Sequence, residues 1–526
     1  MLGIMSEPRL IVIGIDGATW DVLMPLVQRG YMPNLKEIID GGIYGDLRSL
    51  IPPVTGAAWL AIATGLNPGK TGIVDFFKRT DGWRLSSVSS RDFEGKSIWD
   101  YASYCGLDVC VINYPMLYPP YPVKGIMASG LGTPSNIPSV WPKEVFRKLL
   151  ENNVLFPVCI NYHDDKYNDI DFFIDDIEKY MKKFMGANKL LLNWNRSVNL
   201  FITVIQASDW VQHRLWAYID DNHPYHSKLP KEDIVKVKKW FVEFWEMVDD
   251  FLGMFLDFIG GLGDIVIISD HGFGSQYGVF NLGKWLIEEG FTVPFKRFRL
   301  KSLFTMKFLN GVVRRLPNSL RMALRSFSKI RKMYEGLFDY VRYIDLERSK
   351  AIFLEHSIIF GAIYLIDKSI KEEISKSLKH ILKALGLSVT IFYPKEIYKD
   401  GKVDLLPDII VMIEDGRVVV LQSLEKLFNP LYTDEPYSLR HTGGHRVNGI
   451  VAMYGKDVAK VHNPIRACIL DVAPTVMCFL GLPIPKDIDG KVIHSILAGN
   501  KRPRYVERAF YDRLRLAFKA KVSIKM

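Results

Sequence analysis

Three short apolar runs with many β-branched residues recur along the chain, and each leads to an aspartate. They read RLIVIGID, NLFITVIQASD and GDIVIISD, and they end at Asp16, Asp209 and Asp270. A continuous apolar run of this length is typical of a strand that is buried on both faces of a sheet. The pattern therefore predicts three interior strands, each with a carboxylate at or just beyond its end.

Helical patterns separate these runs, including MPNLKEIIDGG after the first and KVKKWFVEFWEMVDDFLGMFLDFIGG before the third. Alternating strands and helices predict an α/β fold with a doubly wound, mostly parallel central sheet flanked by helices. The carboxyl ends of parallel strands meet at one edge, where such sheets bind ligands. The run AIFLEHSIIFGAIYLID is rich in β-branched residues and is interrupted by Glu355 and His356, so it predicts paired strands.

Residues 293–345 differ from the rest, because there is no acidic residue from Lys296 to Tyr334 while Lys and Arg recur. The segment NSLRMALRSFSKIRKMY within it predicts a basic amphipathic helix. We expect a catalytic domain of residues 1–292 and 346–500, a basic helical insertion at 293–345 and a basic tail at 501–526. The insertion is either a helix packed on the core, a cap over the site or a contact with an anionic membrane surface.

The composition is that of a globular protein, with 526 residues, 48% of them hydrophobic, and a net charge of +10. This charge favours anionic partners, although no nucleic-acid-binding module is recognisable. The N-terminus lacks the features of a signal peptide, and no run reaches the roughly 18 apolar residues of a membrane span. The five cysteines form no CxxC pair, so we expect free, buried thiols and a cytoplasmic location.

Histidines accompany the three aspartates. Asp209 and His213 are four residues apart, which places both on one face of a helix. His271 directly follows Asp270, and His445 precedes the apolar run GIVAMYG. Any one aspartate could simply cap a helix or support a turn. Three carboxylates together repel one another unless a cation neutralises them, and imidazole with carboxylate suits zinc or a similar transition metal. These five residues and Asp16 together offer three ligands to each of two metals.

Thr55 lies in IPPVTGAAWLAIATG, at the start of a predicted helix. One interpretation is a helix cap, because a Thr hydroxyl accepts hydrogen bonds from first-turn N–H groups. The other is a nucleophile at the positive end of a helix, where an anion would bind. The stretch by itself favours the cap.

The chain resembles the alkaline phosphatase superfamily, and within it the type I phosphodiesterase/nucleotide pyrophosphatase family. The resemblance rests on seven segments in the family's order. They are GIDGATW, PPVTGAAWLAIATGLNPGKTGIVDFF, INYPMLYPPYPVKGIMASGLGTPS, SDWVQHRLW, SDHGFG, GGHRVNGIVA and DVAPTVMCFLGLPIPKDIDG. It implies that Asp209, His213 and His445 bind one metal. It also implies that Asp16, Asp270 and His271 bind the other, with Thr55 as the nucleophile.

The chain departs from the family at two positions. Thr71 stands where the family often has His, and Phe76 stands where nucleotide pyrophosphatases carry an Asn that steadies a phosphoryl oxygen. Either another donor serves here or the substrate differs. Lys70 and His441 are weak candidates for substrate contacts.

The resemblance implies a hydrolase of phosphoric esters, a phosphodiesterase or nucleotide pyrophosphatase, that acts through a covalent phosphothreonine. Two divalent ions are expected, zinc first, with manganese or another transition metal as alternatives. A sulfatase is disfavoured, because Thr55 lacks the Cys/Ser-x-Pro-x-Arg context. A phospho-headgroup transferase and a sugar-phosphate mutase of the same superfamily stay open as alternatives.

Overall fold

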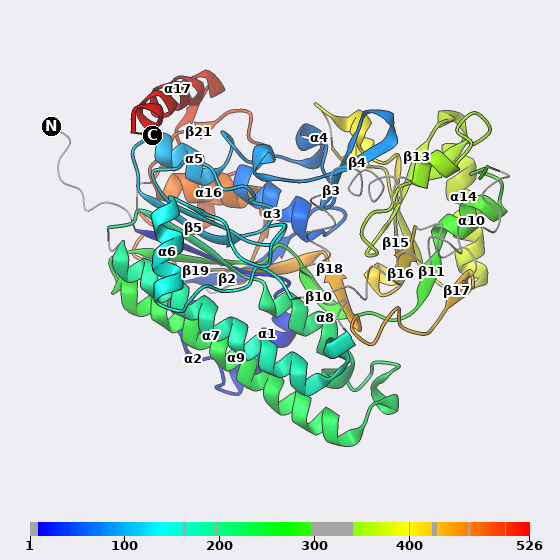
Figure 1. The fold of residues 1–526 in the computed structure, drawn as a ribbon, viewed down its shortest axis with the longest axis horizontal. Coiled ribbons are helices and arrows are strands. Elements are labelled where there is room, and N and C mark those ends of the chain that lie inside the picture. The colour runs from blue at the N-terminus through cyan, green and yellow to red at the C-terminus, as the bar shows by residue number, and fades with distance from the viewer. Residues whose placement is uncertain are drawn as a thin grey trace.

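The computed structural model describes residues 9–160, 165–195, 197–295, 340–398, 400–422, 429–460, 463–499 and 501–525. Its centre is a nine-stranded sheet, with order β20-β2-β19-β9-β1-β8-β5-β6-β7 (Figure 1). The strands are β20 (Ile465–Cys468), β2 (Ile43–Arg48), β19 (Asn448–Gly455), β9 (Asp264–Ile268), β1 (Leu10–Ile15), β8 (Leu200–Ile205), β5 (Val109–Tyr114), β6 (Gly125–Ser129) and β7 (Val140–Trp141).

The predicted interior strands are confirmed as three neighbours at the middle of this sheet. β1 pairs in parallel with β8 on one side and with β9 on the other. β5 continues the parallel region between β8 and β6. The run GIVAMYG forms β19, which is antiparallel to both β9 and β2. The sheet is therefore mostly parallel, as predicted.

Helices cover both faces of the sheet, and alternate residues of β1 therefore belong to two different cores. Ile11, Ile13 and Ile15 belong to one core, whereas Leu10 and Val12 belong to the other. The first core is completed by α1 (Trp20–Gln28), α2 (Pro33–Gly41), α7 (Ile170–Trp194), α8 (Ala207–Ile219) and α9 (Lys231–Ile259). The second is completed by α3 (Thr55–Thr64), α5 (Ile98–Tyr104) and α16 (Val472–Phe479).

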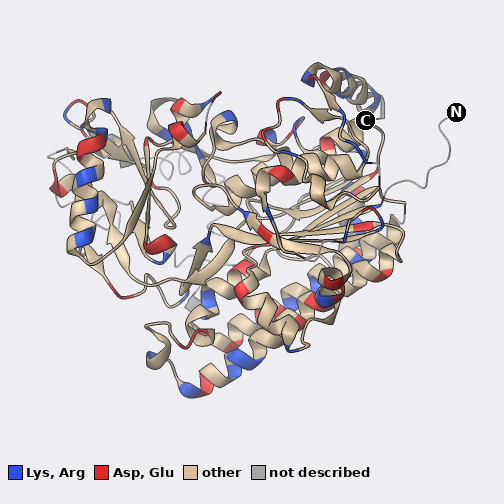
Figure 2. Ribbon diagram, turned by 180° about the vertical axis from the view of Figure 1, so that it is seen from behind, with Lys and Arg blue, Asp and Glu red and all other residues tan. Residues whose placement is uncertain are grey.

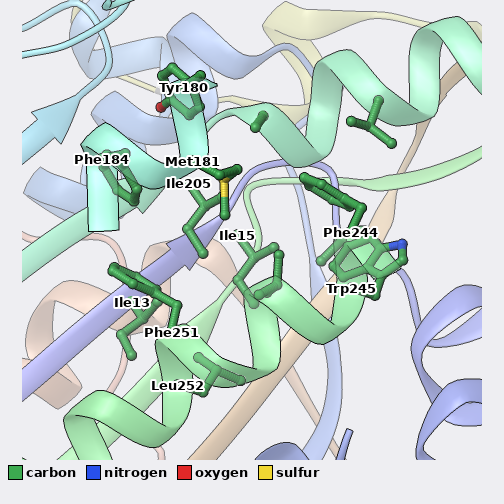
Figure 3. Packing of buried hydrophobic residues seen from close by; sticks show 14 of the residues in the cluster. Ile13, Ile15, Tyr180, Met181, Phe184, Ile205, Phe244, Trp245, Phe251 and Leu252 are labelled. Atoms are coloured by element: carbon green, nitrogen blue, oxygen red, sulfur yellow. The ribbon is translucent and has the colours of Figure 1, made fainter. Parts of the chain in front are cut away.

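Large side chains fill the first core. Aromatic residues of α7 and α9 pack on β1 and β8, and each fully buried side chain of this size contributes about 1.5–3 kcal/mol to folding. Figure 3 shows Ile13, Ile15, Tyr180, Met181, Phe184, Ile205, Phe244, Trp245, Phe251 and Leu252 in contact across these elements.

A smaller lobe lies beside the main sheet (Figure 1). Its four-stranded antiparallel sheet has the order β12 (Ala351–Phe353), β13 (Gly361–Leu365), β15 (Ile409–Ile413) and β14 (Val389–Phe392). The paired strands predicted from AIFLEHSIIFGAIYLID are confirmed as β12 and β13. Beside this sheet lie α10 (Leu282–Glu288), α14 (Lys371–Ala384) and the short strands β16 (Val419–Leu421), β11 (Val279–Asn281) and β17 (Tyr432–Thr433).

The small sheet contacts the main domain through one of its faces. Ile363 and Leu365 of β13 pack beneath α10 and α14, whereas Tyr364 packs in the same core as Ile51 and Val54. Ile51 and Val54 lie directly ahead of Thr55. The lobe therefore supports the segment that leads to the predicted nucleophile.

The C-terminal tail forms α17 (Arg508–Lys525), which packs on α5. Tyr511 is buried against Tyr101, and the rings of Phe518 and Tyr104 are 5.5 Å apart. Figure 2 shows that the charged residues of α17 are mostly basic. Its apolar side thus contacts the protein. Residues 296–339, with the predicted basic amphipathic helix of the insertion, lie outside the described residues.

No helix among the described residues is both long enough and apolar enough to cross a bilayer. All five cysteines are free, as predicted, but the expectation that all are buried is wrong, because Cys105 is exposed and Cys159 and Cys468 are only partly buried.

Candidate active site

The six predicted ligand residues meet at the carboxyl edge of the main sheet. Asp16 directly follows β1, and Asp270 lies two residues beyond β9. Asp209 and His213 lie on α8, as the four-residue spacing predicted. The last two ligands are carried by an antiparallel pair, β10 (Gly272–Ser275) and β18 (Gly443–Arg446). His271 directly precedes β10, and His445 lies on β18.

Thr55 is the first residue of α3, whose N-cap position is taken by Val54. The Thr55 side chain is buried, and its Oγ1 lies 3.1 Å from Nε2 of His271. The hydroxyl thus faces the predicted ligands. Its place at the N-terminus of α3 also brings it near the positive end of the helix dipole.

Asp209, His213 and His445 form the first group of ligand atoms. Oδ1 of Asp209 is 3.4 Å from Nε2 of His213 and 3.2 Å from Nε2 of His445. The two Nε2 atoms are 3.1 Å apart. Three donor atoms that approach one another this closely surround a common point, which is the arrangement a bound cation requires.

Asp16, Asp270 and His271 form the second group. Nε2 of His271 is 3.5 Å from Oδ1 of Asp16 and 3.3 Å from Oδ2 of Asp270. The ligand atoms of these three residues all lie within 4.8 Å of one another, and the same is true of Asp209, His271 and His445. His271 therefore lies between the two groups, with its ring stacked 3.5 Å from that of His445.

Asp16 and Asp270 each have one carboxylate oxygen that accepts a hydrogen bond from the protein. Trp59 Nε1 donates to Oδ2 of Asp16, and the Gly17 N–H donates to Oδ1 of Asp270. In contrast, Oδ1 of Asp16, Oδ2 of Asp270 and Oδ1 of Asp209 are buried without a hydrogen-bond partner. Buried oxygens of this kind are costly unless something satisfies them. A metal ion in each group would do so.

Contacts to backbone carbonyls orient the three histidine rings. Nδ1 of His213 faces the carbonyl of Gly443 at 2.7 Å, and Nδ1 of His445 faces the carbonyl of Pro53 at 2.9 Å. His271 Nδ1 likewise faces a carbonyl, that of Gly272, at 3.0 Å. Because a carbonyl oxygen only accepts, each Nδ1 carries the proton and each Nε2 keeps its lone pair for a metal.

The charges of the site reflect its burial. Burial, with the neighbouring carboxylates of Asp270 and Asp209, raises the pKa of Asp16 well above its usual value. Burial likewise raises the pKa of Asp270 to about 7. Burial would also raise the pKa of Asp209, but the surrounding histidines outweigh it and hold that pKa below its usual range. Burial lowers the pKa of both His213 and His271, so these rings stay neutral.

A cavity of about 140 Å³ opens in front of Thr55. Both lobes line it. Besides four of the predicted metal ligands, its described walls are Thr55, Phe76, Leu131, Gln206, Trp210, Gln276, Ser357, Ile358, Ile359 and His441.

The two weak substrate candidates differ in position. His441 lines this cavity, with its ring 5.1 Å from the ring of His213. Lys70 does not line it, because its Nζ pairs with Oδ1 of Asp489 at 2.6 Å and donates to the Asp487 carbonyl. Lys70 therefore joins two segments of the main domain.

Several residues of the site gave no sequence signal. Gln206 follows β8 within the same run that ends at Asp209, but nothing distinguishes its amide from a surface glutamine in sequence. Trp59 looked like an ordinary apolar helix residue. Ser357 and Ile358 come from a different lobe, so only the folded structure brings them to Thr55.

Comparison with known proteins identifies the family. A family model described as type I phosphodiesterase / nucleotide pyrophosphatase matches residues 10–444. The chain belongs to this family. It is thus an enzyme that hydrolyses phosphoric esters, and the predicted resemblance is confirmed. A search of curated protein sequences gave no match.

Solved structures resemble the fold of this phosphodiesterase-family enzyme at low sequence identity. Phosphonoacetate hydrolase from Sinorhizobium meliloti is 14% identical, with a TM-score of 0.54, and the match covers 90% of this chain and 96% of that chain. Human ectonucleotide pyrophosphatase/phosphodiesterase 5 is 13% identical, with a TM-score of 0.49, over 93% of this chain and 100% of that chain. The likeness to the hydrolase confirms the alkaline-phosphatase-like fold.

Proposed function

We propose that the enzyme hydrolyses phosphoric diesters through a covalent phosphothreonine at Thr55, in a centre that holds two divalent metal ions. One observation carries this proposal. Three buried carboxylate oxygens without hydrogen-bond partners, from Asp16, Asp209 and Asp270, converge with unprotonated histidine nitrogens beside the Thr55 hydroxyl.

The ligand set divides into two triads. Asp209, His213 and His445 would hold one ion, and Asp16, Asp270 and His271 the other. The mixture of imidazole and carboxylate donors favours zinc, with manganese as the alternative. When bound, the ions supply charge that favours the Thr55 alkoxide, and they stabilise both the attacking and the leaving oxygen.

The protein's own groups then position the reaction. Thr55 Oγ1 attacks phosphorus, and the alcohol leaves on the opposite side, which gives the phosphothreonine. Water later cleaves the new bond and restores the hydroxyl. The N–H groups of Gly56 and Ala57 lie in the first turn of α3, where no intrahelical carbonyl accepts from them. They can hold a non-bridging oxygen as charge develops on it.

The charge of the site favours diesters over monoesters. Two divalent ions bring four positive charges against the three carboxylates, which leaves about one positive charge for the substrate. A diester carries one negative charge, whereas a monoester carries nearly two at neutral pH. Among the described residues that line the cavity there is no Lys or Arg. This described part of the wall thus offers no further cation for the second charge of a monoester.

The test compares bis-p-nitrophenyl phosphate with p-nitrophenyl phosphate, and the metal content is measured in the same sample. We expect diester cleavage with about two bound ions, lost in Thr55→Ala and in chelated protein. If Thr55→Ala keeps the turnover of the wild type, the phosphothreonine is wrong. A metal-loaded protein that cleaves neither ester would instead favour a transferase or a mutase.

A further inference from the structure

Gln206 lines the cavity with a buried amide that forms no hydrogen bond to any group among the described residues. It directly follows β8 and takes the N-cap position of α8, three residues before Asp209. Its residue is 1% exposed, and both Nε2 and Oε1 lack a hydrogen-bond partner. Buried side-chain amides are normally paired, because an unpaired one loses its hydration without compensation. An amide left in this state beside the nucleophile requires an explanation.

Two other glutamines nearby use their amide nitrogens. Gln212, six residues further along the chain and also buried, donates from Nε2 to the Gly17 carbonyl at 2.9 Å and to the Ser208 carbonyl at 3.1 Å, although its Oε1 also lacks a partner. Gln276, which also lines the cavity, donates to the Gly416 carbonyl. Gln206 differs from both, because its nitrogen donates to no group among the described residues. Packing against the protein therefore does not explain its amide.

Another residue of the cavity wall does not serve as a donor. Phe76 lines the cavity at the position where the family resemblance implies an Asn that steadies a phosphoryl oxygen. A phenyl ring cannot donate a hydrogen bond. The cavity wall therefore has one position without the expected amide and one buried amide without a partner.

We propose that Gln206 binds substrate, and that its Nε2 donates a hydrogen bond to a non-bridging oxygen of the phosphoryl group held before Thr55. This inference rests on the proposed function. It specifies the ligand as a phosphoryl group, and it supplies the donor that Phe76 lacks. A neutral amide suits the single charge of a diester, since it stabilises the oxygen without attracting a second charge.

The proposal has a thermodynamic consequence that a structural role would not have. Gln206→Met keeps the length of the side chain and removes both unpaired polar atoms, so the thermal midpoint should stay the same or rise. Gln212→Met is the matched control. It removes an amide that makes two hydrogen bonds from the same helix, so its thermal midpoint should fall.

The experiment measures the affinity of metal-loaded protein for inorganic phosphate, by calorimetry, in the wild type, Gln206→Met and Gln206→Glu. We expect Gln206→Met to lower phosphate affinity and kcat/KM for bis-p-nitrophenyl phosphate by about 10- to 100-fold, with unchanged metal content. Gln206→Glu should lower both further, because it places a negative charge beside the anion.

Wild-type phosphate affinity in Gln206→Met would overturn the proposal. So would a loss of bound metal, which would make Gln206 a ligand, or a fall in thermal midpoint as large as that of Gln212→Met. The phosphate measurement needs no turnover. If the wild type cleaves neither ester but phosphate binding still depends on Gln206, the proposed hydrolysis fails and this inference stands.

Discussion

At the scale of single residues, the site contains buried carboxyl groups, whose burial next to one another is unfavourable for folding. Asp16 and Asp270 are completely buried, close to each other and close to Asp209. Without a cation, the fold stabilises these two as neutral acids, which is why the pKa of each is raised. The metal-free protein should therefore behave differently from the loaded one as the pH changes.

We predict that chelated protein loses stability between about pH 6.5 and 8. The pKa of Asp270 is about 7 in the fold against an ordinary value of 3.8, so the folded state holds a proton that the unfolded state has lost. Stability from that proton disappears as the pH rises through 7, at a cost of about 1 kcal/mol for Asp270. His213 and His271 act in the opposite direction up to about pH 7.5, because unfolded histidines still hold some protons there while the lowered pKa values keep the folded rings neutral. The raised pKa of Asp16 adds to the loss from Asp270 and makes the net change a decline.

Urea unfolding of chelated protein at the two pH values measures this effect. With zinc in excess the decline should vanish, because metal binding favours deprotonated ligands. Equal stability of the chelated protein at both values would contradict the prediction.

Trp59 provides a second prediction at this scale. Its Nε1 donates to Oδ2 of Asp16, which directs the other oxygen toward the second ligand group. Removing an outer hydrogen bond of this kind typically lowers metal affinity by about 10- to 100-fold. We expect this from Trp59→Phe in a competitive chelator titration. Trp99→Phe removes a similar indole bond, to Tyr121, and should leave the metal affinity unchanged.

At the scale of elements, a buried hydrogen-bonded carboxylate joins the two lobes at the cavity. Oδ2 of Asp75 accepts from the backbone N–H of Ser357 and lies 2.9 Å from Nδ1 of His356. Oδ1 of Asp75 accepts from the N–H of Phe76. Ser357 and Phe76 both line the cavity, on different lobes. One carboxylate thus fixes the distance between two of its walls.

We predict that Asp75→Ala destabilises the protein by about 3 kcal/mol, because Nδ1 of His356 and the N–H of Ser357 lose their buried acceptor. It should also raise KM for the diester by about tenfold or more, since both walls are released. Asp249→Ala is the control: Asp249 holds Asn34 and Leu35 by similar bonds, away from the cavity. It should reduce stability without changing KM. A normal KM in Asp75→Ala would show that the anchor serves stability alone.

At the scale of the whole molecule, the sequence predicted the main domain better than the small lobe. β1, β8 and β9 are uninterrupted apolar runs, so their place inside a sheet and the acids at their ends were readable. The meeting of the proposed ligand residues at one edge could also be predicted, because chain spacing and sheet topology bring them there. The small-lobe strands are short, two to five residues each, and most of their pairings join segments distant in sequence. For the same reason nothing in the sequence linked Asp75 to His356, 281 residues away.

We propose that the main domain carries the chemistry and that the small lobe encloses the substrate, and this leads to a prediction for the whole molecule. Thr55 and all six proposed metal ligands lie outside residues 279–433, which contain the small lobe. Val279 pairs with Thr433 across an antiparallel ladder, so the ends of this segment are adjacent and Gly278 can be joined to Asp434 by a short linker. Because Ser357, Ile358 and Ile359 would be lost from the cavity wall, KM should rise at least about tenfold. The metal content should remain near that of the wild type, although the thermal midpoint should fall as Ile51 and Val54 become exposed. Metal analysis of the shortened protein in the cold, beside diester kinetics, checks both statements. If the metal is lost with the lobe, the small lobe shapes the ligands themselves, and the assignment of chemistry to one domain and substrate enclosure to the other is wrong.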